Sequence, residues 1–120
     1  MRVLFLDDDP YVLQVMARML SRDVEVEIAT TFGEAWQRLQ ASPIDAVVSD
    51  QKLGPGATGL QFLELLAVSH PHVVRLVMSG DEVPGWERHA KALLRKPFTR
   101  DAFLAALNLR RGSRSLEAVR

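Results

Sequence analysis

The stretch that decides the fold reads Arg2-Val-Leu-Phe-Leu-Asp-Asp-Asp-Pro10. An unbroken apolar run stops at three aspartates, which is typical of a buried strand that ends at a charged edge. Asp9 followed by Pro10 then predicts a helix start, because aspartate is a good N-cap and proline fits the first helical position. The stretch therefore predicts a strand over residues 2–6 and a helix over residues 10–21.

The same alternation of strand and helix continues along the chain. We expect further strands over residues 24–29, 44–49, 73–78 and 92–95. We expect further helices over residues 31–41, 60–69 and 99–109, and a short one over residues 84–91. Five strands that alternate with helices predict an α/β fold, in which a parallel sheet carries helices on both faces. In such a sheet, ligands bind beyond the carboxyl ends of the strands.

Composition narrows the classes of function. The chain has 120 residues, no cysteine, and 15 basic against 15 acidic residues. This excludes a disulfide framework and a thiolate metal site, and the charge balance argues against nucleic acid or a membrane surface as a partner. No apolar run is long enough for a signal peptide or a membrane span, so we expect a cytoplasmic protein. The length predicts one domain over residues 1–109, followed by a basic tail or linker over residues 110–120.

Polar residues follow the predicted strands where each strand ends. Asp7 and Asp8 follow the first strand, Asp50 the third, Ser79 the fourth and Lys96 the fifth. Because the carboxyl ends of parallel strands meet at one edge of a sheet, we expect these side chains to converge. Clustered carboxylates repel one another unless a cation neutralises them, and Mg²⁺ is the typical ion for such oxygen ligands. Carboxylates, an ammonium group and a hydroxyl together favour phosphoryl transfer.

Four motifs carry a resemblance to a known family. They are Leu6-Asp-Asp-Asp-Pro10, Ser49-Asp50, Met78-Ser-Gly80 and Lys96-Pro-Phe98, and each closes a predicted strand. In this order they resemble the receiver domain of bacterial two-component response regulators, over residues 2–109. The resemblance implies a three-layer sandwich whose five-stranded parallel sheet has the flavodoxin-like order 2-1-3-4-5.

The resemblance also implies roles for the strand-end residues. Asp50 would accept a phosphoryl group from the phosphohistidine of a sensor histidine kinase or a phosphotransfer protein. Asp8 and Asp50 would bind Mg²⁺ together with the backbone carbonyl of Lys52, and Asp7 would act on the metal through water. No further cofactor is implied.

Two more residues complete the implied site. Ser79 would bond a phosphoryl oxygen after transfer, and Lys96 would pair first with the acidic cluster and then with the phosphoryl group. The peptide bond between Lys96 and Pro97 would be cis. We also expect Lys52 and Asp81 to pair across the mouth of the site and to slow hydrolysis.

The chain departs from the family pattern in two segments. The loop after Asp50 places Gly59 one residue late, which indicates an insertion of one residue. The segment between Ser79 and Lys96 is several residues shorter than usual, which predicts a shortened fourth helix. Leu93 stands where the family often has tyrosine or phenylalanine. The output mechanism and the output partner therefore do not carry over from the family, and the oligomeric state stays open.

The main expectation is a phosphoacceptor domain that promotes its own phosphorylation and dephosphorylation and is not an enzyme in the ordinary sense. Two alternatives compete with it. The first is a pseudo-receiver that binds partners independently of phosphorylation. The second is a phosphatase of the haloacid-dehalogenase type, with Asp7 as nucleophile and Asp9 as acid and base. Tyr11 stands where that family has threonine or valine, and no acidic pair follows Lys96, so the second alternative is the weaker.

Overall fold

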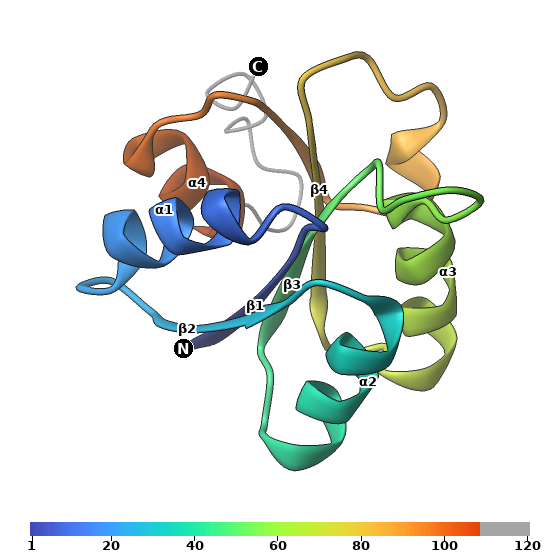
Figure 1. Ribbon diagram of the computed structural model, residues 1–120, viewed down its shortest axis with the longest axis horizontal. Helices are drawn as coiled ribbons and strands as arrows, with labels where there is room; N and C mark the ends of the chain where they lie inside the picture. The colour runs from blue at the N-terminus through green and yellow to red at the C-terminus, as the bar shows by residue number, and fades with distance from the viewer. Residues whose placement is uncertain (109–120) are drawn as a thin grey trace.

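A five-stranded parallel sheet forms the centre of the protein (Figure 1). The computed structural model describes residues 1–108, so residue 109 and the expected tail lie outside the described residues. The sheet has the order β2-β1-β3-β4-β5, which confirms the predicted topology. Its strands are β1 (Arg2–Leu6), β2 (Glu25–Ala29), β3 (Ala46–Asp50), β4 (Val74–Ser79) and β5 (Ala92–Arg95).

Helices cover both faces of the sheet. One face carries α1 (Pro10–Leu20) and α4 (Arg100–Asn108), and the other carries α2 (Phe32–Ala41) and α3 (Gly59–Ser69) (Figure 1). The helix expected over residues 84–91 is reduced to a single 3-10 turn, η1 (Trp86–Arg88). Gly85, immediately before this turn, has a φ of 83°, a left-handed conformation that does not continue a right-handed helix. The described residues thus hold four α-helices rather than five.

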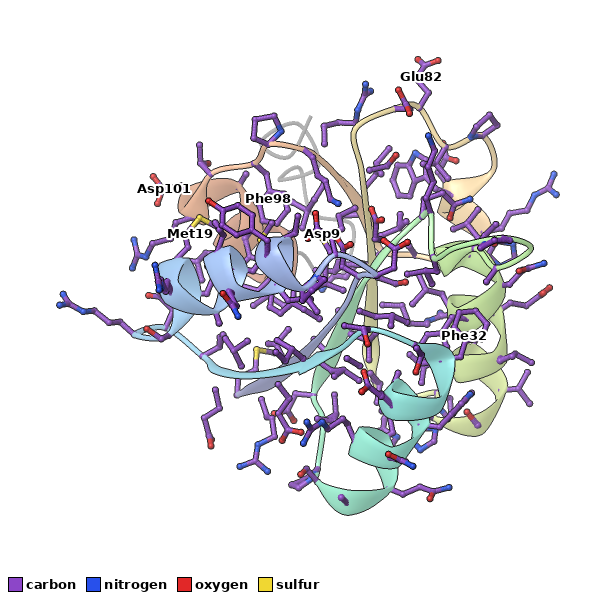
Figure 2. All side chains as sticks on the ribbon, viewed as in Figure 1. Asp9, Met19, Phe32, Glu82, Phe98 and Asp101 are labelled. Atoms are coloured by element: carbon purple, nitrogen blue, oxygen red, sulfur yellow. The ribbon has the colours of Figure 1, made fainter. Side chains whose placement is uncertain are left out.

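The core consists of two apolar layers separated by the sheet. Phe5 and Phe103 meet with ring centroids 5.5 Å apart on the α1 and α4 side. On the α2 and α3 side, the ring centroid of Phe62 lies 5.1 Å from those of Phe32 and Trp36. Figure 2 shows Phe32 at the start of α2 and, on the other face, Phe98 beside α1 and α4. Every residue of β3 is buried, as expected of a central parallel strand.

Local hydrogen bonds fix where the helices begin. Asp9 Oδ1 accepts from the Tyr11 N–H at 2.9 Å, so Asp9 is the N-cap of α1 as predicted. Thr31 Oγ1 accepts from the Glu34 N–H at 3.1 Å at the start of α2. These caps start α1 and α2 within a few residues of the strands that precede them. Parallel pairing of the strands brings their carboxyl ends to one edge of the sheet.

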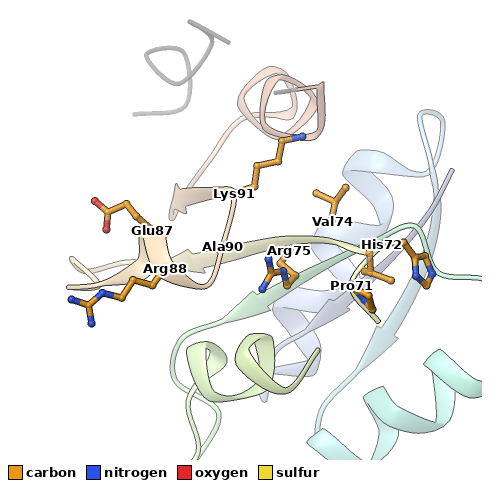
Figure 3. A pocket seen from close by; sticks show the side chains of 9 residues that line it. Pro71, His72, Val74, Arg75, Glu87, Arg88, Ala90 and Lys91 are labelled. Carbon is orange, nitrogen blue, oxygen red and sulfur yellow. The ribbon is translucent and has the colours of Figure 1, made fainter. Parts of the chain in front are cut away.

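A shallow groove of about 280 Å³ lies at the other end of the sheet, where β4 begins (Figure 3). It is lined by Pro71, His72, Val73, Val74, Arg75, Glu87, Arg88, Ala90 and Lys91. The strand-end aspartates do not line it, so this groove is separate from the candidate site. Across residues 1–108, no helix combines the length and the apolar character needed to cross a bilayer.

Candidate functional site

The carboxylates of Asp7, Asp8 and Asp50 converge at the carboxyl ends of β1 and β3. One oxygen of each lies within 4.8 Å of the others. The register explains this, because Leu6 pairs with Ser49 and each of these residues is followed in the chain by an aspartate. Asp7 and Asp50 are buried and Asp8 is exposed, so the cluster opens to solvent on one side.

Lys96 supplies the positive charge of the cluster. Its Nζ lies 2.8 Å from Asp7 Oδ2 and 2.9 Å from Asp50 Oδ1. The backbone N–H of Lys96 donates to Ser79 O at 2.8 Å, which ties the residue to the end of β4. The Lys96–Pro97 peptide is cis, as expected. One ammonium group thus bridges two carboxylates that come from two different strands.

Burial and charge act in opposite directions on these groups. Burial raises the pKa of Asp50 above its ordinary value, and the nearby charges of Asp7 and Asp8 add to this, while Lys96 opposes it. Burial works against the charge of Lys96, but its hydrogen bonds to Asp7 and Asp50 outweigh burial, so the pKa of Lys96 is raised. The cluster holds three carboxylates against one ammonium group, and its oxygen donors fit a hard divalent cation.

Ser79 ends β4, the strand next to Asp50. Met78 pairs with Asp50 in the register, so Ser79 lies one step farther along the neighbouring strand. Its side chain is buried, and its Oγ accepts from the Asp81 N–H at 3.0 Å. Ser79 therefore places a hydroxyl at the same edge of the sheet as the carboxylates.

Lys52 and Asp81 form a rim above the buried groups. The Lys52 Nζ lies 3.4 Å from Asp81 Oδ2, which confirms the predicted pairing of these residues. Both side chains are largely exposed, so the pair is open to solvent screening. Glu82 follows Asp81 on the connection after β4, and its side chain points away from the sheet (Figure 2).

Gln51 and Gly59 support the strand end that carries Asp50. The sequence pattern assigned Gln51 no role and indicated Gly59 only as the glycine that closes the loop, one residue late. The Gly59 N–H donates to Gln51 O at 2.9 Å. A side chain at position 59 would collide with the Asp50 carbonyl oxygen and lie 2.9 Å from Ser49 Oγ, so the helix packs directly on the strand that carries Asp50. The sequence offers one signal for the role of Gln51, namely a polar side chain directly after the strand-end residue Asp50.

Comparison with protein families places the chain among known domains. The family model of the response regulator receiver domain matches residues 3–108. The response regulator Rre1 of Synechocystis is 34% identical over 108 residues, which cover 82% of this chain and 46% of that protein. The hydrogenase transcriptional regulatory protein HoxA of Cupriavidus necator is 32% identical over 78 residues, 65% of this chain and 16% of that protein. The chain spans less than half the length of these curated relatives.

Solved structures give the same grouping. A response regulator of Burkholderia pseudomallei, with a phosphorylated aspartic acid, a calcium ion and citrate, superposes with a TM-score of 0.82 at 25% identity, covering 98% of this chain and 69% of that one. A CheY-like receiver domain protein of Methanospirillum hungatei superposes with a TM-score of 0.78 at 26% identity, covering 88% and 89%.

Proposed function

This chain belongs to the family of response regulator receiver domains of two-component systems, and we propose that it accepts a phosphoryl group on Asp50. The donor is the phosphohistidine of a sensor histidine kinase or a phosphotransfer protein. The observation that carries the proposal is the setting of Asp50, a buried carboxylate on the central strand that lies 2.9 Å from Lys96 and beside Asp7 and Asp8. We place the working unit at residues 1–109, with residues 110–120 as a tail or linker.

The oxygen ligands for Mg²⁺ are the carboxylates of Asp8 and Asp50 and the backbone carbonyl of Lys52, with Asp7 acting through water. The convergence of the Asp7, Asp8 and Asp50 carboxylates supports this assignment, because Mg²⁺ in proteins prefers oxygen ligands. When bound, the ion supplies positive charge for the phosphoryl oxygens. The Burkholderia structure carries a calcium ion together with its phosphorylated aspartic acid, which also supports the assignment.

Transfer breaks one P–N bond and forms one P–O bond. Lys96 engages one oxygen of the Asp50 carboxylate. A carboxylate oxygen of Asp50 attacks phosphorus, and the electron pair of the P–N bond returns to the imidazole, which takes up a proton from water. The Ser79 hydroxyl then donates to a phosphoryl oxygen, and the Lys96 ammonium group balances the added charge. Asp50 is itself modified, so the domain is a phosphoacceptor that promotes its own turnover rather than an enzyme acting on a separate substrate.

The chemistry of the donor also bears on location and output. Histidine kinases draw their phosphoryl group from ATP, so we place the domain in the cytoplasm. Phosphorylation would switch its contacts with an output partner. The short η1 turn supports one second candidate, a pseudo-receiver that binds partners without phosphorylation, because the crossover from β4 to β5 lacks a full helix.

Intact-mass spectrometry after incubation with phosphoramidate and MgCl₂ tests the proposal. The wild type should gain one base-labile phosphoryl group, and Asp50→Asn should gain none. Asp9→Asn is the matched control, because asparagine keeps the N-cap of α1 and Asp9 has no part in the proposed site. This variant should be phosphorylated like the wild type, and a chelator should abolish the adduct.

Other outcomes support the alternatives. If neither phosphoramidate nor a phosphorylated histidine kinase modifies the wild type, the pseudo-receiver replaces the proposed function. An adduct on Asp7 that Asp9→Asn alters would support the phosphatase. The cap contact of Asp9 argues against that outcome, because its carboxylate already accepts from the Tyr11 N–H at 2.9 Å.

A further inference from the structure

Gln51, the residue directly after Asp50, is anchored at three points. Its backbone N–H donates to Met78 O on β4 at 3.0 Å. Its backbone oxygen accepts from the Gly59 N–H at 2.9 Å, and its side-chain Oε1 accepts from the Leu60 N–H at 3.0 Å. One residue thus joins the end of β3 to both β4 and α3.

The two contacts with α3 satisfy backbone groups that a helix start leaves open. The first N–H groups of any helix have no partner within the helix. Gly59 and Leu60 begin α3, and both donate to Gln51. The next N–H, that of Gln61, donates to Thr58 Oγ1 at 3.2 Å. Gln51 therefore serves as part of the cap of α3, although it lies on the far side of the loop.

The loop between these anchors is closed by hydrogen bonds both near its base and at its tip, where the Ala57 N–H donates to Gly54 O at 3.3 Å. Lys52 forms an isolated bridge with Thr58, and the Leu53 N–H donates to Ala57 O at 3.2 Å. Residues 54–56, at the tip of the loop, are exposed to solvent. The geometry of Lys52 is thus set from the base of the loop, where Gln51 is fixed.

We propose that Gln51 is a positioning residue for phosphoryl transfer, which holds Asp50 and the Lys52 carbonyl in the arrangement that binds the divalent cation. The inference rests on the proposed function. Gln51 lies between these two residues in the chain, so its bonds to β4 and α3 fix the peptide units on both sides of it, and with them the start of Lys52. The Leu53 N–H shares a peptide unit with the Lys52 carbonyl, and its bond to Ala57 O at 3.2 Å holds that unit in turn. Groups that orient metal ligands contribute to metal affinity although they do not touch the metal.

Gln61 provides a matched comparison. Its side-chain Oε1 accepts from the Thr58 N–H at 3.0 Å, the same kind of bond at the same end of the same helix. Gln61 is not attached to β3. A purely structural role for Gln51 would make the two glutamines equivalent, whereas a positioning role would separate them.

The test compares Gln51→Met with Gln61→Met, since methionine keeps the length of the side chain but gives no comparable acceptor. Mg²⁺ affinity is measured by titration calorimetry, phosphorylation by the initial rate with phosphoramidate, and folding by the melting temperature. Gln51→Met should weaken Mg²⁺ binding about tenfold, the lower end of the effect of removing a group that orients a metal ligand. Gln61→Met should lower the melting temperature similarly and leave Mg²⁺ affinity near that of the wild type.

Equal Mg²⁺ affinities in the two variants would overturn the inference while the proposed function stands. A wild type that neither binds Mg²⁺ nor takes up a phosphoryl group would overturn both. Gln51→Glu gives a second result that does not depend on the folding of the methionine variant, because glutamate keeps an oxygen for the Leu60 N–H. Its Mg²⁺ affinity should stay close to that of the wild type, and an affinity as low as that of Gln51→Met would contradict the proposal.

Discussion

Two connections leave the central strands at the site, and they are built differently. The connection from β3 to α3, residues 51–58, is tied back through Gln51, whose backbone and side chain bind the first N–H groups of the helix. The connection from β4 to β5, residues 80–91, contains only the η1 turn, where Trp86 packs against the core cluster on the α3 side. One connection is fixed at its base, and the other returns to the sheet with little regular structure.

The difference shows which parts of the site depend on the connections. Asp7, Asp50 and Lys96 lie at the strand ends, so the sheet itself places them. Each connection contributes one exposed residue to the rim, Lys52 or Asp81. A connection can therefore change in length without moving the charged groups that carry the proposed chemistry.

The largest predicted effect concerns Lys96, which lies after β5 and belongs to neither connection. Lys96→Met should slow phosphorylation of Asp50 on the order of 10²-fold, the usual effect of removing one group that stabilises developing charge. Radiolabel incorporation from a donor kinase measures this. Arg95→Met is the control, because it removes an exposed neighbouring cation. Equal phosphorylation rates in the two variants would show that the Lys96 ammonium group does not take part in the transfer.

Glycine substitutions compare the packing where the first connection reaches α3, at Gly59, with the packing at the start of the second connection, at Gly80. Gly59→Ala should lower the free energy of unfolding by about 1–3 kcal/mol, because the added carbon meets the Asp50 carbonyl and Ser49 Oγ. Gly80→Ala should change it by less than about 0.5 kcal/mol, since nothing lies within 4 Å of the added carbon. Urea unfolding measures both. Similar losses would contradict the contrast between a fixed and a loosely packed connection.

The rim pair should affect the lifetime of the phosphoryl group more than stability. Lys52→Ala and Asp81→Ala should each shorten the half-life of the aspartyl phosphate several-fold, because water then reaches Asp50 more easily. Their effect on unfolding should stay within about 1 kcal/mol, as for other exposed ion pairs. Release of inorganic phosphate follows the decay. An unaltered decay rate in both variants would remove the pair from the mechanism.

Most of the fold follows from the sequence because its signals are local. Apolar runs that stop at aspartate, serine or lysine predicted the strands, and the motifs predicted their order. Residues 84–91 form a single turn rather than a helix because Gly85 has a left-handed backbone conformation, which the spacing of apolar residues does not predict. The contacts of Gln51 were missed because they join residues nine positions apart across a loop, and their geometry is set by the packing of α3 on β3.

The ion pair of Asp23 with Arg100, outside both connections, gives the smallest predicted effect. The hydrogen bond from Arg100 holds the pKa of Asp23 below its ordinary value. The pair therefore stabilises the fold fully at pH values above the ordinary pKa of an aspartate. This stabilisation is lost as the pH falls through the lowered pKa. The difference in melting temperature between the wild type and Asp23→Asn should shrink on acidification, and a difference that grows would contradict the assignment.

The central place of β3 has a consequence for how the protein opens. β3 is paired on both sides, with β1 and β4, whereas β2 and β5 each have one neighbouring strand. Fluctuations that release an edge strand leave Asp50 in its ladder, so its backbone should exchange hydrogen only through global unfolding. An acyl phosphate formed there would keep its folded surroundings while an edge strand opens, so hydrolysis at the exposed edge of the sheet, rather than local unfolding, would set its lifetime.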